Sequence, residues 1–261
     1  MSILDQLAEH ARARVAADEE ILPLPELRER CLALGQGNGE AFSAALQRPG
    51  LSLICEVKKA SPSKGIISES FPYLEIARSY EDAGADAISC LTEPKWFLGS
   101  DEIFRQIRAE VSVPMLRKDF TVSEYQIYQA RLMGANAVLL ICSILDEEAL
   151  SGYLALCRSL GLAALTETHD AEEIRTALRC GAEIIGVNNR NLKDFSVDFG
   201  NAARLRDLVP AECLFVAESG VTGPEDAALI RKSGADAALV GEALMRAGDR
   251  AGLIAAMREA L

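Results

Sequence analysis

The chain has 261 residues, of which 49% are hydrophobic and 25% are charged, a balance that suits one globular domain with a large core. The formal net charge of −12 argues against a nucleic-acid-binding surface, which would need a basic patch. No signal-peptide pattern opens the chain, and no apolar run approaches the ~18 residues that a membrane span needs. We therefore expect a cytoplasmic protein with neither a nucleic-acid nor a membrane partner.

The seven cysteines show no C-x-x-C motif and no spacing typical of a metal site. Four of them lie within apolar runs, where a thiol usually serves as a small buried hydrophobic group: Cys55, Cys90, Cys142 and Cys213. Free thiols fit a reducing cytoplasm. Because the sequence also lacks a P-loop and a His/Cys cluster, it predicts neither a metal ion nor another cofactor.

The first 48 residues are charged and amphipathic, and their apolar residues recur at helical spacing. The pattern predicts three helices, over residues 2–22, 26–34 and 40–46. Pro23 and Pro25 end the first helix, and a glycine-rich stretch separates the second from the third. We expect this N-terminal extension to pack against the rest of the chain, and we hypothesise that residues 1–47 partly cover the mouth of the domain that follows.

From residue 49 onward, short apolar runs alternate with helical segments. The runs, interpreted as strands, cover residues 51–57, 86–91, 113–118, 136–142, 162–167, 183–188, 213–218 and 236–240. The helical segments lie near residues 72–83, 100–110, 123–133, 146–160, 170–180, 198–208, 223–232 and 248–260. Continuously apolar strands that alternate with helices predict a parallel sheet with both faces covered.

An internal repeat indicates how this sheet is arranged. Its four copies are Gly84-Ala85-Asp86-Ala87, Gly134-Ala135-Asn136-Ala137, Gly181-Ala182-Glu183-Ile184 and Gly234-Ala235-Asp236-Ala237. Each glycine can supply the left-handed residue that ends a helix, and successive copies are separated by two βα units. Eight such units predict a single α/β domain, a (β/α)8 TIM barrel over residues 49–261 with the helical extension at 1–48. An open doubly wound sheet is the alternative, but no G-x-G-x-x-G follows the first strand.

A barrel of this kind holds its active site at the C-terminal ends of its strands. Side chains alternate along a strand, so Glu56 and Lys58 share one face and offer a carboxylate and an ammonium for acid/base chemistry. Lys118, Glu167 and Asn188 each end a buried run, where an unpaired polar group is costly. Their position favours a functional role over a structural ion pair.

Other polar residues near the strand ends have simpler interpretations. Arg117 and Asp119 point, by alternation, away from Lys118 and toward the helix layer, which indicates a structural role. We expect His169 to cap or border the helix that begins near Asp170 rather than to take part in catalysis.

Two glycine-containing turns follow the last two strands, Ser219-Gly220 and Gly241-Glu242. Backbone N–H groups beside a helix N-terminus can bind phosphate, and phosphate sites recur after the seventh and eighth strands of this fold. The alternative is that both are merely tight turns. Because the Glu242 carboxylate would repel an anion, we assign this residue a main-chain role only.

Aromatic residues stand in the loops after the second and third strands. Phe97 and Phe120 could form an apolar wall for a planar ligand or could anchor their loops, and for Trp96 loop anchoring is the favoured interpretation. The residues alone therefore predict a barrel enzyme that acts on a phosphorylated, partly apolar small molecule by acid/base chemistry.

Five motifs stand at these strand ends: Glu56-Val57-Lys58-Lys59-Ala60-Ser61-Pro62-Ser63-Lys64-Gly65, Leu91-Thr92-Glu93, Leu116-Arg117-Lys118-Asp119-Phe120, Gly186-Val187-Asn188-Asn189-Arg190-Asn191-Leu192 and Glu218-Ser219-Gly220. Together they resemble the motifs of the indole-3-glycerol-phosphate synthase family of tryptophan biosynthesis, and the resemblance covers essentially the whole chain. It implies a lyase that closes the pyrrole ring of 1-(2-carboxyphenylamino)-1-deoxyribulose 5-phosphate with loss of CO2 and water.

The resemblance also implies roles for the catalytic candidates. Lys118 would be the general acid that activates the substrate carbonyl for ring closure, and Glu167 would stabilise positive charge on the ring or transfer a proton. Lys58 would bind the anionic substrate and act as the acid in the dehydration, with Glu56 as its partner base. Asn188 would position Glu56 or the sugar hydroxyls. One sequence does not divide acid and base roles among the two lysines and two glutamates.

The remaining candidates would bind the substrate. Arg190 would orient the carboxylate side of the anthranilate ring. The phosphate would be surrounded by Ser61, Ser219, Gly220, Gly241 and the main chain of Glu242, and the aromatic ring would be walled by Phe97, Phe120 and Leu139.

Two other classes of protein stay open. One is another phosphate-binding barrel enzyme, such as phosphoribosylanthranilate isomerase or the tryptophan synthase α subunit, which lack the Glu-x-Lys-x-x-Ser set in this form. The other is a non-catalytic barrel that binds a phosphorylated metabolite. We expect a monomer or a weak homodimer.

Overall fold

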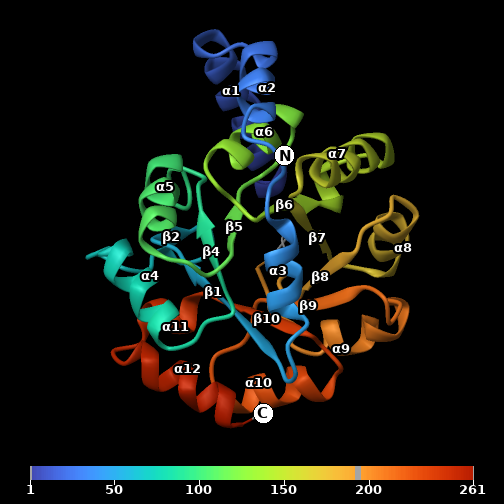
Figure 1. The fold of residues 1–261 in the computed structure, drawn as a ribbon. Coiled ribbons are helices and arrows are strands. Elements are labelled where there is room, and N and C mark those ends of the chain that lie inside the picture. The colour runs from blue at the N-terminus through green and yellow to red at the C-terminus, as the bar shows by residue number, and fades with distance from the viewer. Residues whose placement is uncertain (1, 192–194, 261) are drawn as a thin grey trace.

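The computed structural model describes residues 2–191 and 195–260, and within them eight parallel strands close into a barrel (Figure 1). The barrel strands are β1 (Ser52–Val57), β4 (Ala87–Leu91), β5 (Met115–Lys118), β6 (Ala137–Ile141), β7 (Ala163–Thr168), β8 (Ile184–Asn188), β9 (Leu214–Glu218) and β10 (Ala237–Val240). Strand β1 pairs with both β10 and β4, so the sheet closes on itself. The predicted barrel is confirmed, and the alternative of an open sheet is wrong.

Helices follow the strands and surround the barrel (Figure 1). They are α4 (Tyr73–Asp82), α5 (Asp101–Glu110), α6 (Glu124–Leu132), α7 (Glu147–Leu160), α8 (Ala171–Arg179), α9 (Asn201–Leu205), α10 (Pro224–Lys232), α11 (Glu242–Arg246) and α12 (Arg250–Glu259), with 3-10 turns η1 (Cys142–Ile144) and η2 (Arg206–Leu208). The repeat glycines Gly84, Gly134, Gly181 and Gly234 all have φ between 79° and 85°, as their helix-ending role requires. Among the helices in the described part of the chain, none could cross a membrane.

The helix predicted over residues 198–208 is shorter than expected. Only α9 is α-helical, and the chain then tightens into η2 before Val209 becomes extended. Val209 precedes Pro210, and the proline ring disfavours the helical conformation for the residue before it. The prolyl restriction fits the end of the segment at Leu208, as predicted. The segment is shorter because it begins only at Asn201 and because its last turn is 3-10.

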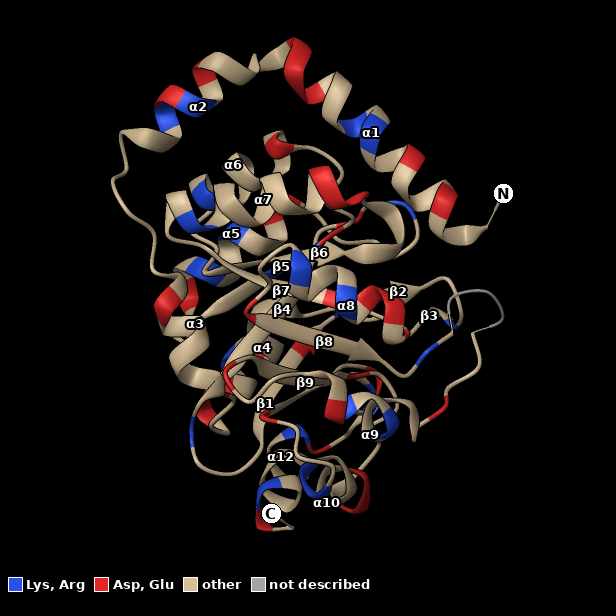
Figure 2. Cartoon of the chain, turned by 90° about the vertical axis from the view of Figure 1, so that its right-hand side faces the viewer, with Lys and Arg blue, Asp and Glu red and all other residues tan. Residues whose placement is uncertain are grey.

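The N-terminal extension forms α1 (Ile3–Ile21), α2 (Leu24–Leu32) and α3 (Gly39–Leu46). Helix α2 begins before Pro25 because a proline is tolerated in the first helical turn. Helix α3 lies at the end of the barrel opposite the small hairpin β2 (Ala60–Ser61) and β3 (Gly65–Ile66) (Figure 2). Its Phe42 and Leu46 are fully buried with the residues of the barrel interior. Gly39 lets α3 approach closely, since a Cβ there would overlap the main chain of Leu162 and Ala163.

Helix α1 reaches the other end of the barrel. Its start lies on the same side as the hairpin (Figure 2), and Leu4 and Leu7 are buried in the interior cluster with Phe120 of the loop after β5. Arg14 makes two hydrogen bonds to the Asp119 carboxylate, at 3.1 and 2.6 Å. The extension therefore covers both ends of the barrel, α3 at the N-terminal ends of the strands and α1 near their C-terminal ends.

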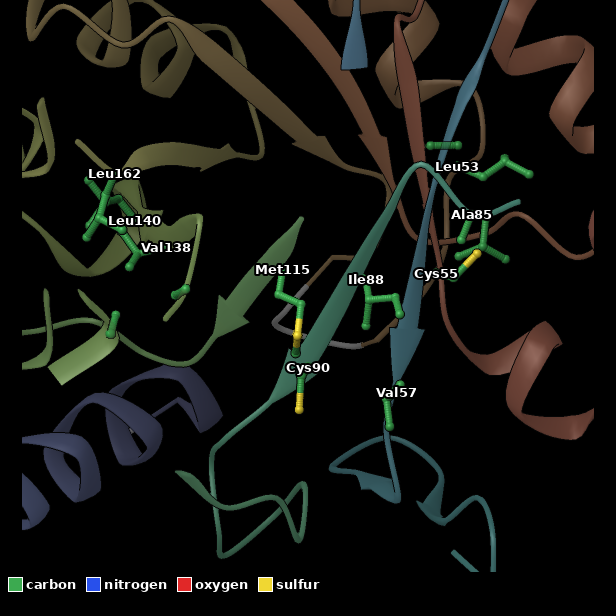
Figure 3. Close-up of a cluster of buried hydrophobic side chains, with 14 of the residues drawn as sticks. Leu53, Cys55, Val57, Ala85, Ile88, Cys90, Met115, Val138, Leu140 and Leu162 are labelled. Atoms are coloured by element: carbon green, nitrogen blue, oxygen red, sulfur yellow. The ribbon is translucent and has the colours of Figure 1, made fainter. Parts of the chain in front are cut away.

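Alternation along the strands divides the core into two layers. Figure 3 shows Leu53, Cys55 and Val57 of β1 in the layer between the strands and the helices. Ile54 instead belongs to the cluster inside the barrel. Glu56, two residues further along β1, therefore points into the barrel.

The four cysteines expected in the core differ in their surroundings. Cys55, Cys90 and Cys142 are buried, although Cys142 lies in η1 just after its strand. Cys213 is only half-buried because β9 begins one residue later than predicted. Burial raises the pKa of the Cys55 and Cys90 thiols, which makes them unreactive and fits their expected role as small hydrophobic groups.

Candidate active site

One cavity of about 870 Å³ opens at the C-terminal ends of the barrel strands. All the site residues predicted from the sequence line it: Glu56, Lys58, Ser61, Phe97, Lys118, Phe120, Leu139, Glu167, Asn188, Arg190, Ser219, Gly220, Gly241 and Glu242. Helix α1 adds three apolar residues to the wall that the sequence did not single out, namely Ile3, Leu4 and Leu7. The cavity thus combines a polar floor with an apolar side.

Lys118 ends β5, and its ammonium lies between two carboxylates. Its Nζ is 3.5 Å from Glu167 Oε2 and 3.5 Å from Glu218 Oε2. Burial alone would lower the pKa of Lys118, but the charges of Glu218 and Glu167 outweigh it and raise this pKa above its ordinary value. Lys118 therefore carries its proton at neutral pH.

Glu167 on β7 is surrounded by groups that favour its anion. Its Oε1 accepts a hydrogen bond from Asn188 Nδ2 at 3.1 Å, while its Oε2 faces Lys118. Burial acts to raise the pKa of Glu167, but the charges of Lys118 and His169 outweigh burial and lower this pKa. Asn188 thus contacts Glu167, and its role toward Glu56 or the sugar hydroxyls stays a prediction.

Glu218 ends β9 and was not among the predicted site residues, although it stands in one of the five motifs. Burial and the charge of Glu167 raise its pKa to about 8, against the opposing effect of Lys118. Gly186 on β8 makes room for it, since a Cβ there would overlap Glu218 Oε1. The strand register pairs Glu218 with Asn188 on β8, and its place at a strand end is the sequence signal that puts it at the mouth.

Glu56 and Lys58 form an ion pair at the end of β1, with Lys58 Nζ donating to Glu56 Oε1. Lys58 keeps 16% of its side chain exposed, whereas Glu56 is almost fully buried. The backbone at Gly241 lies against this pair, and a Cβ there would overlap Glu56 Oε1. The backbone at Gly241 therefore approaches these two side chains closely.

The turns after β9 and β10 differ in their backbone. Ser219 and Gly220 have φ of 67° and 94°, so two successive residues adopt the left-handed conformation. After β10, the Glu242 carboxylate lies 3.1 Å from Arg246 Nε and 3.6 Å from Lys64 Nζ. These cations compensate its charge, which is compatible with a main-chain role for Glu242 beside an anion.

The apolar side of the cavity includes two aromatic rings. Phe97 and Phe120 lie with their centroids 6.0 Å apart at an angle of 40°. Phe97 is held in place by the buried Glu93 carboxylate, which accepts hydrogen bonds from the main-chain N–H groups of Lys95, Trp96 and Phe97 at 2.7 to 3.0 Å. The wall is therefore fixed by a buried acidic residue outside the predicted set.

Three residues predicted to be structural make structural contacts. The Trp96 ring packs edge-on against His10 of α1, with the centroids 5.4 Å apart. Arg117 donates hydrogen bonds to Gln126 O and to Asp101 in the helix layer, at 2.8 and 2.9 Å. Asp119 binds Arg14 of the extension, which ties α1 to the end of β5.

Arg190 follows β8 at the edge of the cavity. Its main-chain N–H donates to Asn188 Oδ1 at 3.0 Å, and its guanidinium donates to Phe195 O at 3.2 Å. The motif that contains Arg190 ends at Leu192, which lies outside the described residues.

His169 has a different environment from the one expected. Asp170 caps α8, because its carboxylate accepts from the main-chain N–H groups of Glu172 and Glu173. His169 borders the helix, as predicted, and Asp170 is the residue that caps it. Its ring instead faces the site, with Nε2 3.4 Å from Glu167 Oε1.

The family model for indole-3-glycerol phosphate synthase matches residues 4–257 of the chain. A relative of that description from Ruminiclostridium cellulolyticum is 48% identical over 256 residues, which cover 98% of each chain. Relatives of the same description from Lactiplantibacillus plantarum and Lacticaseibacillus paracasei are 48% and 46% identical over 98% of this chain, and over 98% and 99% of their own.

Solved structures of lower identity share the barrel. Thiamine phosphate pyrophosphorylase from Pyrococcus furiosus aligns with a TM-score of 0.62 at 20% identity, over 80% of this chain and 95% of that one. N-acetylmannosamine-6-phosphate 2-epimerase from Clostridium perfringens aligns with a TM-score of 0.59 at 16% identity, over 76% and 88%. These two likenesses show the fold alone. The family model and the curated relatives, in contrast, show that the chain belongs to the indole-3-glycerol phosphate synthase family.

Proposed function

We propose that this cavity closes the pyrrole ring of 1-(2-carboxyphenylamino)-1-deoxyribulose 5-phosphate, with loss of CO2 and water, to give indole-3-glycerol phosphate. Membership of the family makes the chain a lyase of tryptophan biosynthesis. One observation supports the assignment of this activity to the cavity residues. Two ammonium groups, each beside a carboxyl group, line one cavity that also has an aromatic wall.

Ring closure needs a proton for the carbonyl oxygen that the aromatic carbon attacks. Lys118 is the proposed donor, because its raised pKa keeps it protonated in the cavity. Glu167, ionised beside it, stabilises the positive charge that the ring carries until CO2 leaves. Asn188 holds Glu167 in the required orientation through its hydrogen bond.

Dehydration needs a second acid and a base. Lys58 protonates the hydroxyl that leaves as water, and Glu56, which accepts its hydrogen bond, takes up the proton that the ring loses.

Glu218 serves the ring-closure step, because its carboxyl, with a pKa of about 8, is mostly protonated at neutral pH and lies 3.5 Å from Lys118 Nζ. It can therefore return a proton to Lys118 after ring closure.

The remaining lining residues bind the substrate. The phosphate lies among Ser61, Ser219, Gly220, Gly241 and the main chain of Glu242, where the carboxylate of Glu242 is compensated by cations. Phe97, Phe120 and Leu139 enclose the aromatic ring. Arg190 orients the carboxylate of the anthranilate ring from the edge of the cavity.

A fluorescence assay for the indole product tests this function. The purified chain is incubated with the carboxyphenylamino-deoxyribulose phosphate, and indole fluorescence is expected to rise with time. A non-catalytic barrel would bind the substrate without any rise. An isomerase would leave it unchanged but would consume phosphoribosylanthranilate, and a tryptophan synthase α subunit would cleave added indole-3-glycerol phosphate instead.

We also propose that the protein works in the cytoplasm as a monomer or weak homodimer, with its extension and barrel as one folding unit. All seven cysteines are free thiols, which supports a reducing compartment. Fractionation of the source cells, light scattering across a concentration series and a single calorimetric unfolding transition are the measurements that check these three points.

A further inference from the structure

His169 stands between the site and the first turn of α8. Its ring is 17% exposed, and it does not line the cavity. Nε2 lies 3.4 Å from Glu167 Oε1, and Nδ1 lies 3.1 Å from Glu173 Oε2. Two carboxylates therefore flank the ring, one on each nitrogen.

Glu173 holds this ring in place. Its Oε2 also accepts a hydrogen bond from the main-chain N–H of His169 at 2.8 Å, and its Oε1 accepts one from Ser143 Oγ at 2.5 Å. The Glu173 side chain is 22% exposed, so it connects the ring to the protein surface. These bonds fix the direction in which Nε2 points, which is toward Glu167.

The two carboxylates also favour a charged ring. Nδ1 lies within hydrogen-bond distance of Glu173 Oε2, whereas Nε2 makes no hydrogen bond to the described residues and approaches Glu167 Oε1 at ion-pair distance. A ring with both nitrogens protonated is an imidazolium. Burial opposes this charge, but the hydrogen bond to Glu173 and the charge of Glu167 outweigh burial and raise the pKa of His169.

We propose that His169, held by Glu173, is a positioning residue that keeps Glu167 ionised and turned toward Lys118. The two oxygens of Glu167 then have separate partners: Oε2 faces Lys118, whereas Oε1 receives Asn188 and faces the imidazolium. This inference rests on the proposed role of Glu167 in ring closure.

Groups from every neighbouring element bear on the charge of His169. Glu167 from β7, Glu173 from α8 and Glu218 from β9 are the ionisable groups that favour the imidazolium. The uncharged neighbours are Ser143 of η1, with Oγ 3.3 Å from Nδ1, and Asn201 of α9, which donates to His169 O at 3.1 Å.

Nuclear magnetic resonance tests the coupling without any turnover. The chain has only two histidines, so the ring signals of His169 are identified by their persistence in His10→Ala. We expect the titration midpoint of His169 to fall by about one unit or more in Glu167→Gln and in Glu173→Gln, because each loses a carboxylate beside the ring. Glu172→Gln, which removes an exposed charge from the same turn of α8, should leave the midpoint in place. An unchanged midpoint in Glu167→Gln would overturn the proposal.

Kinetics test the consequence for the site. In His169→Asn, the positive charge beside Glu167 is lost, so the pKa of Glu167 rises and the acid limb of the kcat–pH profile should move up by about one to three units. KM should change less than about twofold because His169 does not line the cavity. A raised KM with an unmoved acid limb would make His169 merely structural. If the wild-type chain produced no indole, the proposed function would fail while the resonance experiment still decided the coupling.

Discussion

Replacing Lys118 by alanine removes the ammonium between Glu167 and Glu218. At 3.5 Å and an effective dielectric constant of about 20, the attraction between Lys118 and the ionised Glu167 is worth about 5 kcal/mol before the cost of desolvation is subtracted. Glu218, with a pKa of about 8, is mostly protonated at neutral pH, so one buried anion loses its main cation. That anion keeps Asn188 and His169 as partners, and we therefore expect Lys118→Ala to fold.

The expected kinetic effect is much larger than the structural one. Loss of a well-placed general acid costs about 10²–10⁴ in rate, which is about 3–5 kcal/mol of activation free energy. We expect kcat of Lys118→Ala to fall by this factor or more, measured as the rate of indole fluorescence at saturating substrate. Circular dichroism and cooperative thermal unfolding provide the check that the fold survives.

Lys118→Arg separates proton donation from charge. Arginine keeps the positive charge between the two carboxylates but does not release a proton at neutral pH. We expect KM of Lys118→Arg to stay near the wild-type value while kcat stays low. Turnover near the wild-type rate in Lys118→Arg would show that Lys118 acts by charge alone, and the same result in Lys118→Ala would refute its place in the mechanism.

Four further variants test the surroundings of the site. Gly186→Ala puts a Cβ where Glu218 Oε1 lies, so we expect about 1–3 kcal/mol of destabilisation in urea unfolding and a lower kcat. The raised pKa of Glu218 means that the folded chain binds one more proton than the unfolded chain between about pH 4.5 and 8. The free energy of unfolding should therefore fall as pH rises through this window, by up to about 1.4 kcal/mol per pH unit. Glu218→Gln should flatten this slope when unfolding is measured at a series of pH values. A chain that begins at Arg48 loses both α1 and α3, so its Tm should fall and its KM should rise. Ile3→Ala should raise KM with little change in Tm, because it shortens one side chain of the cavity wall. An unchanged KM in both variants would show that α1 does not contribute to substrate binding.

The fold was predictable because its signals are local. Each strand is a short apolar run, and glycines such as Gly84 and Gly134 take the left-handed conformation that ends a helix wherever the repeat places them. Alternation along β1 was enough to place Glu56 on the inner face with Ile54. The helix predicted over residues 198–208 begins only at Asn201 and ends in a 3-10 turn, and the apolar spacing indicates neither feature.

The parts of the site that the sequence did not indicate depend on contacts between distant segments. Glu218 of β9 lies beside Lys118 of β5 because the sheet closes into a barrel and brings together strands that do not pair with each other. The sequence does not distinguish Gly186 from any other strand glycine, because the need for a glycine there comes from the position of the Glu218 carboxylate. His169 stands one residue before a capping aspartate, which favoured a role at the helix, although its spacing of two residues from Glu167 is the signal that places both side chains on one face.

The two ammonium groups of the cavity differ in their surroundings, and this difference supports the division of labour between them. Lys58 has one carboxylate partner, whereas Lys118 has two and a raised pKa, so it holds its proton firmly in the resting cavity. Transfer becomes favourable only as the attacked carbonyl oxygen gains negative charge and becomes a stronger base than the amine. A donor of this kind needs a neighbouring acid to restore its proton, and a carboxyl with a pKa of about 8 is suited to neutral pH. Glu218→Gln, which keeps the shape and the neutral charge but has no acidic proton, should therefore lower kcat while KM stays near the wild-type value.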